Sequence, residues 1–140
     1  MPGNTGTGAV LEKMVLPALR HGGYTVTTQV HIGQRLGGGR HVVDVVASES
    51  GGVTHLISLK WQQVSGTAEQ KVPFEVICLA HAIATGSGKF AKGYVVLGGE
   101  GWRLREFYTS GLLPRYLSNI ESVIVTKLED FVARANRGEL

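Results

Sequence analysis

The sequence predicts an α/β fold in which helices flank a mixed β-sheet. Segments rich in β-branched residues alternate with longer segments whose apolar residues recur at helical spacing. Clusters of glycine separate these segments at the spacing of turns. The expected order of elements is α-β-β-β-α-β-α-β-α, within one domain that spans residues 1–140.

The first helix is expected over residues 8–21, because Leu11, Val15 and Leu19 form one apolar stripe at helical spacing. Two glycines follow directly and supply a stop signal. Pro17 lies inside this segment, so it predicts either a kink or a helix start at that point.

Three strands are expected next, over residues 25–32, 40–48 and 53–61. Each is rich in β-branched residues, and glycine-containing connections join them, which predicts an antiparallel meander. The second strand is apolar almost throughout, as in a strand that is covered on both faces. Asp44 at its centre is therefore unusual.

A long and mostly apolar helix is expected over residues 67–85. Thr67 and Gln70 have capping-box spacing at its start, although Pro73 could instead be its first residue. The remaining elements are a buried strand over 93–99, a short amphipathic helix near 101–110, a strand over 122–125, and a helix over 127–136 with capping-box spacing of Thr126 and Glu129.

Composition excludes several classes of protein. Hydrophobic residues make up 43% of the chain and charged residues 18%, which supports a packed core and argues against disorder. No apolar run reaches the roughly 20 residues that cross a bilayer, and the first residues lack the pattern of a signal peptide. A lone cysteine, Cys78, rules out an intramolecular disulfide, and the five histidines lack the spacing of metal ligands. We therefore expect an intracellular, soluble protein, whose net charge of +3 permits a phosphate-rich partner without requiring one.

Polar residues occupy strand positions where apolar residues are expected. Asp44 is centred in VVDVV, while Ser58, Lys60 and Gln62 alternate along HLISLKWQ and so project from one face of a strand. Burying an unpaired carboxylate and an ammonium costs on the order of several kcal/mol each, unless they pair or bind a metal. One interpretation is a buried Asp44–Lys60 ion pair, with Ser58 and Gln62 as hydrogen-bonding neighbours.

The other interpretation is a hydrolytic metal site. Phosphodiester cleavage needs a hard divalent cation that is held by oxygen ligands, which a carboxylate provides. It also needs a cation that orients or deprotonates the attacking water and offsets the charge that grows on the phosphate. Asp44 and Lys60 match these two roles.

An acid on the second strand, a lysine near the end of the third strand and a long helix after it resemble the PD-(D/E)XK nuclease superfamily. The shared core of that superfamily is α-β-β-β-α-β, which is the order predicted above. The KWQ and GTAEQK blocks within SLKWQQVSGTAEQKVPFE are similar to small phage and bacterial members. The resemblance covers roughly residues 9–98 and implies a restriction-endonuclease-like core.

The resemblance implies roles for individual residues. Asp44 corresponds to the first acid of the motif and is a metal ligand, and Lys60 corresponds to the lysine beside the attacking water. The backbone carbonyl of Leu59 is implied as a further ligand. Gln62 matches a glutamine that orients ligands or touches phosphate in several branches of the superfamily.

The sequence departs from the motif at Ser58, two residues before the lysine, where the superfamily normally carries Asp or Glu. Some members with Ser-x-Lys recover the charge from a glutamate on the following helix. Glu69 and Glu75 are the candidates, about 60° to either side of the apolar stripe by helical geometry. We favour Glu69, which belongs to the GTAEQK block, and keep Glu75 in reserve; alternatively, Glu69 only complements the N-terminus of the helix.

Two other charged residues have both a functional and an ordinary explanation. Glu12 falls where many members of the superfamily carry an additional glutamate near the metal, or it is solvated and pairs with Lys13 or Arg20. Lys71 either neutralises a scissile phosphate or remains solvated.

The connection between the first two strands offers candidate contacts to nucleic acid. Gln34, Arg35 and Arg40 flank a flexible Gly37–Gly39 loop that would follow a DNA groove. Each of the three is also explained as solvated polar surface.

The leading hypothesis is a Mg²⁺-dependent DNA endonuclease of the homing, restriction or junction-resolving type, with Mn²⁺ as a substitute metal. Water would attack the phosphate in line, without a covalent intermediate. Because one site cuts one strand, we expect a homo-oligomer, either a dimer or a tetramer, in the cytoplasm of a bacterial or phage-infected bacterial cell. The alternatives are a catalytically inactive nucleic-acid-binding module on the same fold, which Ser58 motivates, and an α/β interaction domain with a structural Asp44–Lys60 pair.

Overall fold

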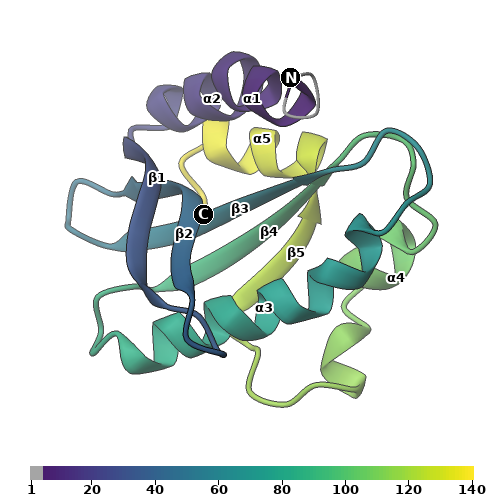
Figure 1. The fold of residues 1–140 in the computed structure, drawn as a ribbon. Helices are drawn as coiled ribbons and strands as arrows, with labels where there is room; N and C mark the ends of the chain where they lie inside the picture. The colour runs from purple at the N-terminus through teal and green to yellow at the C-terminus, as the bar shows by residue number, and fades with distance from the viewer. Residues whose placement is uncertain (1–4) are drawn as a thin grey trace.

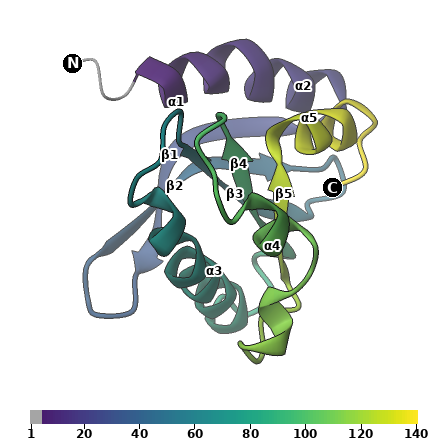
Figure 2. The same ribbon diagram turned by 90° about the vertical axis from the view of Figure 1, so that its right-hand side faces the viewer.

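The computed structural model describes residues 5–140 as a five-stranded sheet with helices on both faces (Figure 1). The helices are α1 (Thr5–Val10), α2 (Leu16–His21), α3 (Ala68–Thr85), α4 (Arg105–Thr109) and α5 (Leu128–Asn136). The strands are β1 (Thr25–Gln34), β2 (Arg40–Ser48), β3 (Thr54–Trp61), β4 (Lys92–Gly98) and β5 (Val123–Lys127). Helices α1, α2 and α5 cover one face of the sheet, and α3 and α4 cover the other (Figure 2). The predicted α/β class and element order are confirmed.

The sheet is mixed, as predicted. Its strands lie in the order β1-β2-β3-β4-β5, so each strand neighbours the next one along the chain. The first three strands pair antiparallel and form the expected meander. The pairs β3–β4 and β4–β5 are parallel, because α3 and the α4 segment carry the chain back across the sheet.

The N-terminal helix is continuous but not uniform. A π-helical segment, Leu11–Val15, joins α1 to α2, and Pro17 lies in the first turn of α2. Proline has no N–H to donate and its ring crowds the carbonyl four residues earlier. The expected disturbance around Pro17 therefore takes the form of a π-helical turn rather than a break.

Both predicted capping boxes are wrong. Thr67 precedes α3 but its side chain makes no cap hydrogen bond, whereas Gln62 Oε1 accepts the hydrogen bond of the Ala68 N–H at 3.0 Å. Thr126 lies within β5, which extends to Lys127, so it cannot cap α5. The predicted helix near 101–110 is also shorter, because it occupies only α4 and a separate 3₁₀ turn follows.

Two apolar clusters, one on each face of the sheet, hold the layers together. The cluster beneath α1, α2 and α5 includes Val15, Leu19, Tyr94 and Phe131, and the cluster beneath α3 includes Leu56, Val72, Val76 and Leu79. Trp61 packs on the first cluster, and Cys78 is a buried free thiol in α3. Within residues 5–140, no helix combines the length and apolar character needed to cross a lipid bilayer.

Candidate functional site

The sheet splits next to Asp44. The ladder between β2 and β3 runs from the Ser48–Thr54 pair to the Val45–Ile57 pair and goes no further, although β2 stays paired with β1 as far as Arg40. Beyond this point β3 remains paired only with β4. The backbone of β3 is thus open on one side from Ser58 onward, where the Ser-x-Lys motif begins, and Asp44 is the first residue of β2 past the split.

Asp44 closes part of this opening with its side chain. Its Oδ2 accepts a hydrogen bond from the Leu59 N–H at 2.7 Å, so the aspartate of β2 is tied directly to the residue before Lys60. Burial raises the pKa of Asp44, while the Leu59 hydrogen bond and the positive charge of Lys60 oppose that rise. The hydrogen bond and the charge of Lys60 therefore do not fully offset the cost of burying the ionised carboxylate.

A cavity of about 390 Å³ opens beside Asp44, between β1, β2 and the N-terminal helix. Its wall consists of Thr7, Gly8, Leu11, Gln29 and Asp44. Gln29 has a φ of 52°, which is rare for a residue with a side chain, and its pairing with β2 is interrupted between the Thr28–Val45 and Val30–Val43 pairs. Backbone strain of this kind concentrates at functional sites. No pattern in the sequence singled out Gln29.

Lys60 lies near Glu75 rather than in contact with Asp44. Its Nζ is 3.9 Å from Glu75 Oε1, and within residues 5–140 no ion pair joins it to Asp44. The interpretation of Asp44 and Lys60 as a direct ion pair, one of the two considered from the sequence, is therefore wrong. The positive charge of Lys60 still lowers the pKa of Asp44, whereas the negative charge of Glu75 raises it.

Glu75 is a buried carboxylate near nitrogen atoms of three side chains, Arg35, His41 and Lys60. Its side chain is 5% exposed, Arg35 Nη2 donates to its Oε1 at 3.1 Å, and His41 Nε2 lies 3.6 Å from its Oε2. Burial alone would raise the pKa of Glu75, but the His41 ring and the positive charges of Lys60 and Arg35 lower it to about 2. Glu75 is thus ionised at any physiological pH. The sequence did not identify His41 as a site residue, because the five histidines lack the spacing of metal ligands.

Glu69 serves a different part of the molecule. Its Oε1 accepts hydrogen bonds from the Arg103 and Leu104 N–H groups at 3.0 and 2.6 Å, so the carboxylate anchors the loop before α4. Gln62 Nε2 lies 3.4 Å from Glu69 Oε2 and donates to the Gly101 carbonyl at 2.9 Å. Gln62 and Glu69 therefore form one polar clip that joins the end of β3, the start of α3 and this loop.

The other candidate residues belong neither to the surroundings of Asp44 and Glu75 nor to the clip of Gln62 and Glu69, with the exception of Arg35. Ser58 is buried on the same strand as Lys60. Glu12 is exposed in the π-helical segment and pairs with neither Lys13 nor Arg20 in the described part of the chain. Gln34, Arg40 and Lys71 are exposed, whereas Arg35 turns back onto α3. Across residues 5–140, no three His, Cys, Asp or Glu side chains converge into a ready-made metal cluster.

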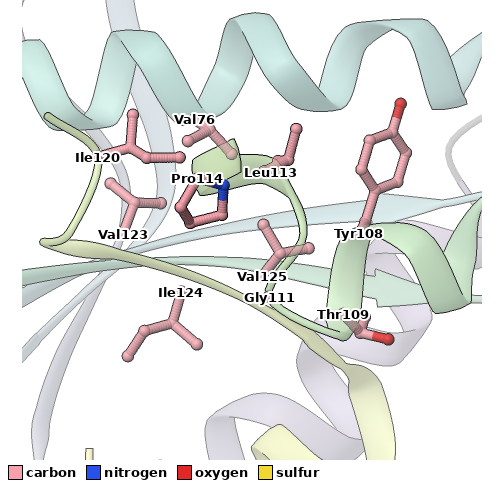
Figure 3. Close-up of a pocket in the computed structure, with 10 residues that line it drawn as sticks. All are labelled: Val76, Tyr108, Thr109, Gly111, Leu113, Pro114, Ile120, Val123, Ile124 and Val125. Carbon is pink, nitrogen blue, oxygen red and sulfur yellow. The ribbon is translucent and has the colours of Figure 1, made fainter. Parts of the chain in front are cut away.

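An apolar pocket lies elsewhere, between α3, β5 and the segment that follows α4 (Figure 3). Its volume is about 220 Å³, and Val76, Leu113, Pro114 and Val125 are among its lining residues. None of Asp44, Lys60 and Glu75 lines it. Its lining residues include no carboxylate and no basic side chain.

Comparisons with known proteins place the fold. A family model described as a PD-(D/E)XK nuclease superfamily domain matches residues 3–139. Among solved structures, the crystal structure of AF1548, a protein of unknown function, is similar with a TM-score of 0.50 and 14% identity, over 81% of this chain and 54% of that one. The chain thus spans about half the length of that protein, and likeness at this identity shows the fold alone. No curated protein matches the chain.

Proposed function

This chain belongs to the PD-(D/E)XK nuclease superfamily, and from that premise we propose that it is a Mg²⁺-dependent DNA endonuclease centred on Asp44 and Lys60. The observation that carries the proposal is the hydrogen bond between Asp44 Oδ2 and the Leu59 N–H at the split between β2 and β3. This bond ties the acid of β2 to the residue that precedes Lys60 on β3 and so supports the assignment of the two residues to one site.

The environment of Asp44 fits a divalent cation. Its carboxylate is desolvated, has a raised pKa and forms no ion pair in the described part of the chain. A buried carboxylate in this state gains from a cation at its free oxygen. We propose that Asp44, the Leu59 carbonyl and Glu75 hold Mg²⁺, or Mn²⁺ in its place. The bound ion would supply a water of lowered pKa and offset charge on the phosphate.

Lys60 supplies the positive charge on the protein side of the reaction. Its side chain is 26% exposed, so its ammonium reaches solvent while Glu75 holds it from behind. An ammonium donates up to three hydrogen bonds, one of which can go to the attacking water and another to a phosphate oxygen. We propose that Lys60 orients that water and stabilises the charge that develops on the phosphate.

We assign the second carboxylate to Glu75 rather than Glu69. Glu75 lies 3.9 Å from Lys60 and acts on the pKa of Asp44, whereas both oxygens of Glu69 face the clip with Gln62 and the loop before α4. In this proposal Gln62 and Glu69 keep the end of β3 in place and do not touch the substrate. Glu12 remains a candidate for an outer contact only.

The exposed Gln34, Arg40 and Lys71 are the proposed contacts to the DNA backbone, together with Arg35. Phosphate contacts of this kind position a duplex without reading its sequence. One centre cuts one strand, so cleavage of both strands requires a homo-oligomer, and we propose a dimer or tetramer for that activity.

Incubation of the purified protein with supercoiled plasmid, linear duplex and four-way-junction DNA tests this function. Cleavage should require Mg²⁺ or Mn²⁺ and should disappear in Asp44→Asn and Lys60→Gln. Lys89→Gln, an exposed lysine after the end of α3, is the matched control and should cleave normally. Cleavage by Asp44→Asn at the wild-type rate, or without any added metal, would contradict the proposal.

A second candidate is a nucleic-acid-binding module that does not cleave. Ser58 at the usual acid position favours it, as does the engagement of Glu75 by Arg35. Binding to the same DNA substrates, with no cleavage of any of them in either metal, would support this function.

A further inference from the structure

The side chain of Arg35 connects the hairpin that joins β1 to β2 with α3. Arg35 Nη2 donates to Glu75 Oε1 at 3.1 Å and lies 3.8 Å from Cys78 Sγ, and the guanidinium sits over the Phe74 ring at 5.6 Å. The Arg35 N–H donates to the Gly39 carbonyl at 2.7 Å, which fixes the backbone of the residue within the turn. The Arg35 side chain thus adds a polar contact between the hairpin tip and α3, where Leu36 lines a shallow pocket with Ile77 and His81.

Arg35 is also accessible to a second partner. Its side chain is 30% exposed, whereas that of Glu75 is 5% exposed. A guanidinium carries five N–H donors in a planar fork, and among residues 5–140 Arg35 uses only Nη2 for its side-chain hydrogen bonds. That fork matches the geometry of phosphate and binds it bidentately. A DNA phosphate at the hairpin would thus compete with Glu75 for the same arginine.

A metal ion and the Arg35 guanidinium would compete for the carboxylate of Glu75. A divalent cation that approaches Glu75 Oε1 meets the Arg35 guanidinium already bound there, and the two positive charges repel each other. Lys60 and His41 are farther from the carboxylate, at 3.9 and 3.6 Å. Of the three neighbours, Arg35 makes the closest contact, and it belongs to a segment that a substrate can reach.

We propose that Arg35 is a clamp that withholds Glu75 from the metal site until a DNA phosphate draws the guanidinium away. This inference rests on the proposed function, because it assumes that Glu75 is a metal ligand. By linkage, DNA then strengthens metal binding and metal strengthens DNA binding by the same factor. The nuclease would assemble its metal site on its substrate and stay inactive on free metal.

Calorimetric titration of Mn²⁺ into the protein without DNA tests the clamp directly. Arg35→Gln should bind Mn²⁺ more tightly than the wild type, by about fivefold or more, which is the lower end of ordinary coupling between sites. Arg40→Gln removes the same charge from the same hairpin but from an exposed side chain, so its Mn²⁺ affinity should stay within about twofold of the wild type. In a Glu75→Gln background, Arg35→Gln should have no effect.

A phosphorothioate duplex, which resists hydrolysis, completes the experiment. It should raise the Mn²⁺ affinity of the wild type but not that of Arg35→Gln. Three results would overturn the clamp. The first is that Arg35→Gln and the wild type bind Mn²⁺ with equal affinity without DNA, and the second is that Arg40→Gln gains as much Mn²⁺ affinity as Arg35→Gln. The third is that neither the wild type nor Arg35→Gln binds Mn²⁺. Plasmid cleavage reports on the nuclease separately: cleavage with unchanged Mn²⁺ affinity in Arg35→Gln contradicts the clamp alone. An Arg35-dependent affinity with no cleavage of any DNA contradicts the nuclease alone.

Discussion

The carboxylate of Asp44 on β2 accepts a hydrogen bond from the backbone N–H of Leu59 on β3, at 2.7 Å. The regular ladder between these strands has already ended at the Val45–Ile57 pair, so a side chain takes the place of a backbone acceptor. This substitution satisfies a strand N–H at the split and fixes the distance between the acid and the Ser-x-Lys motif. The candidate site is thus a consequence of how the sheet ends its pairing.

Asp44→Asn should stabilise the protein while removing cleavage. Burial raises the pKa of Asp44 in the folded state above its value in the unfolded chain. The protonated carboxyl therefore stabilises the fold at low pH, and this stabilisation is lost as the pH rises through the folded pKa. At neutral pH the ionised carboxylate therefore destabilises the fold, whereas an asparagine oxygen can still accept the Leu59 hydrogen bond. We expect the Tm to rise by roughly 2–4 °C for each kcal/mol gained.

Thermal unfolding at pH 7 without divalent metal measures this effect. Asp130→Asn, an exposed aspartate in the first turn of α5, is the matched control and should leave the Tm unchanged or slightly lower. A Tm of Asp44→Asn below that of the wild type would show that the ionised carboxylate stabilises the fold.

Glu75 should make the protein sensitive to acid. Its pKa is lowered from 4.5 to about 2, so its stabilising contribution is fully present above pH 4.5 and is lost as the pH falls toward 2. That contribution is on the order of 3 kcal/mol. Urea unfolding between pH 2 and 7 should show a fall in the free energy of unfolding that is much smaller in Glu75→Gln.

Glu121→Gln, at an exposed position before β5, provides the comparison and should keep the wild-type dependence on pH. The assignment of the acid sensitivity to Glu75 fails if Glu75→Gln and Glu121→Gln lose stability with the same slope.

Gln62 should act as a structural clip. Gln62→Ala removes the acceptor for the Ala68 N–H at the start of α3 and the donor to the Gly101 carbonyl. We expect a loss of about 1–3 kcal/mol in the free energy of unfolding. Gln63→Ala, at the exposed neighbouring position, should change it by less than about 0.5 kcal/mol. Equal losses in the two variants, measured by urea unfolding, would refute the clip.

A side chain at Gly99 should destabilise the fold, because the backbone of Gln62, the residue after β3, lies against this glycine. Its φ is +91°, and an added Cβ would lie 2.4 Å from the Gln62 carbonyl oxygen. Gly88 has a similar φ of +81° but open space around it. Gly88→Ala should cost about 1–2 kcal/mol for the backbone conformation alone. Gly99→Ala should cost a further 1–3 kcal/mol or so for overpacking, and similar Tm values for the two variants would contradict this.

The fold was accessible from the sequence because its signals are local. β-branched segments such as 40–48 and the apolar stripe of 67–85 report on their own burial, and glycine clusters mark the turns between them. The capping boxes failed because spacing alone does not show which partner reaches a helix end. In the fold Gln62 reaches Ala68 from the end of β3, across a loop whose path no local pattern predicts.

Only part of the candidate site could be predicted from the sequence. Asp44 and Lys60 could be selected because each is a charged residue in an apolar strand. The choice between Glu69 and Glu75 depends on how α3 rotates onto the sheet, which the packing of Val72 and Val76 determines and the sequence motif does not. The strained backbone of Gln29 could not be predicted, since glutamine in an exposed strand carries no signal of a positive φ.

Diffraction from crystals soaked in Mn²⁺, recorded where manganese scatters anomalously, tests the central claim most directly. We predict an anomalous peak within about 2.5 Å of an Asp44 carboxylate oxygen, on the side of the split that Lys60 faces, with Glu75 rather than Glu69 as the second carboxylate. A peak at Glu69, or ordered Mn²⁺ bound only at other places with none beside Asp44, would contradict this account of the site.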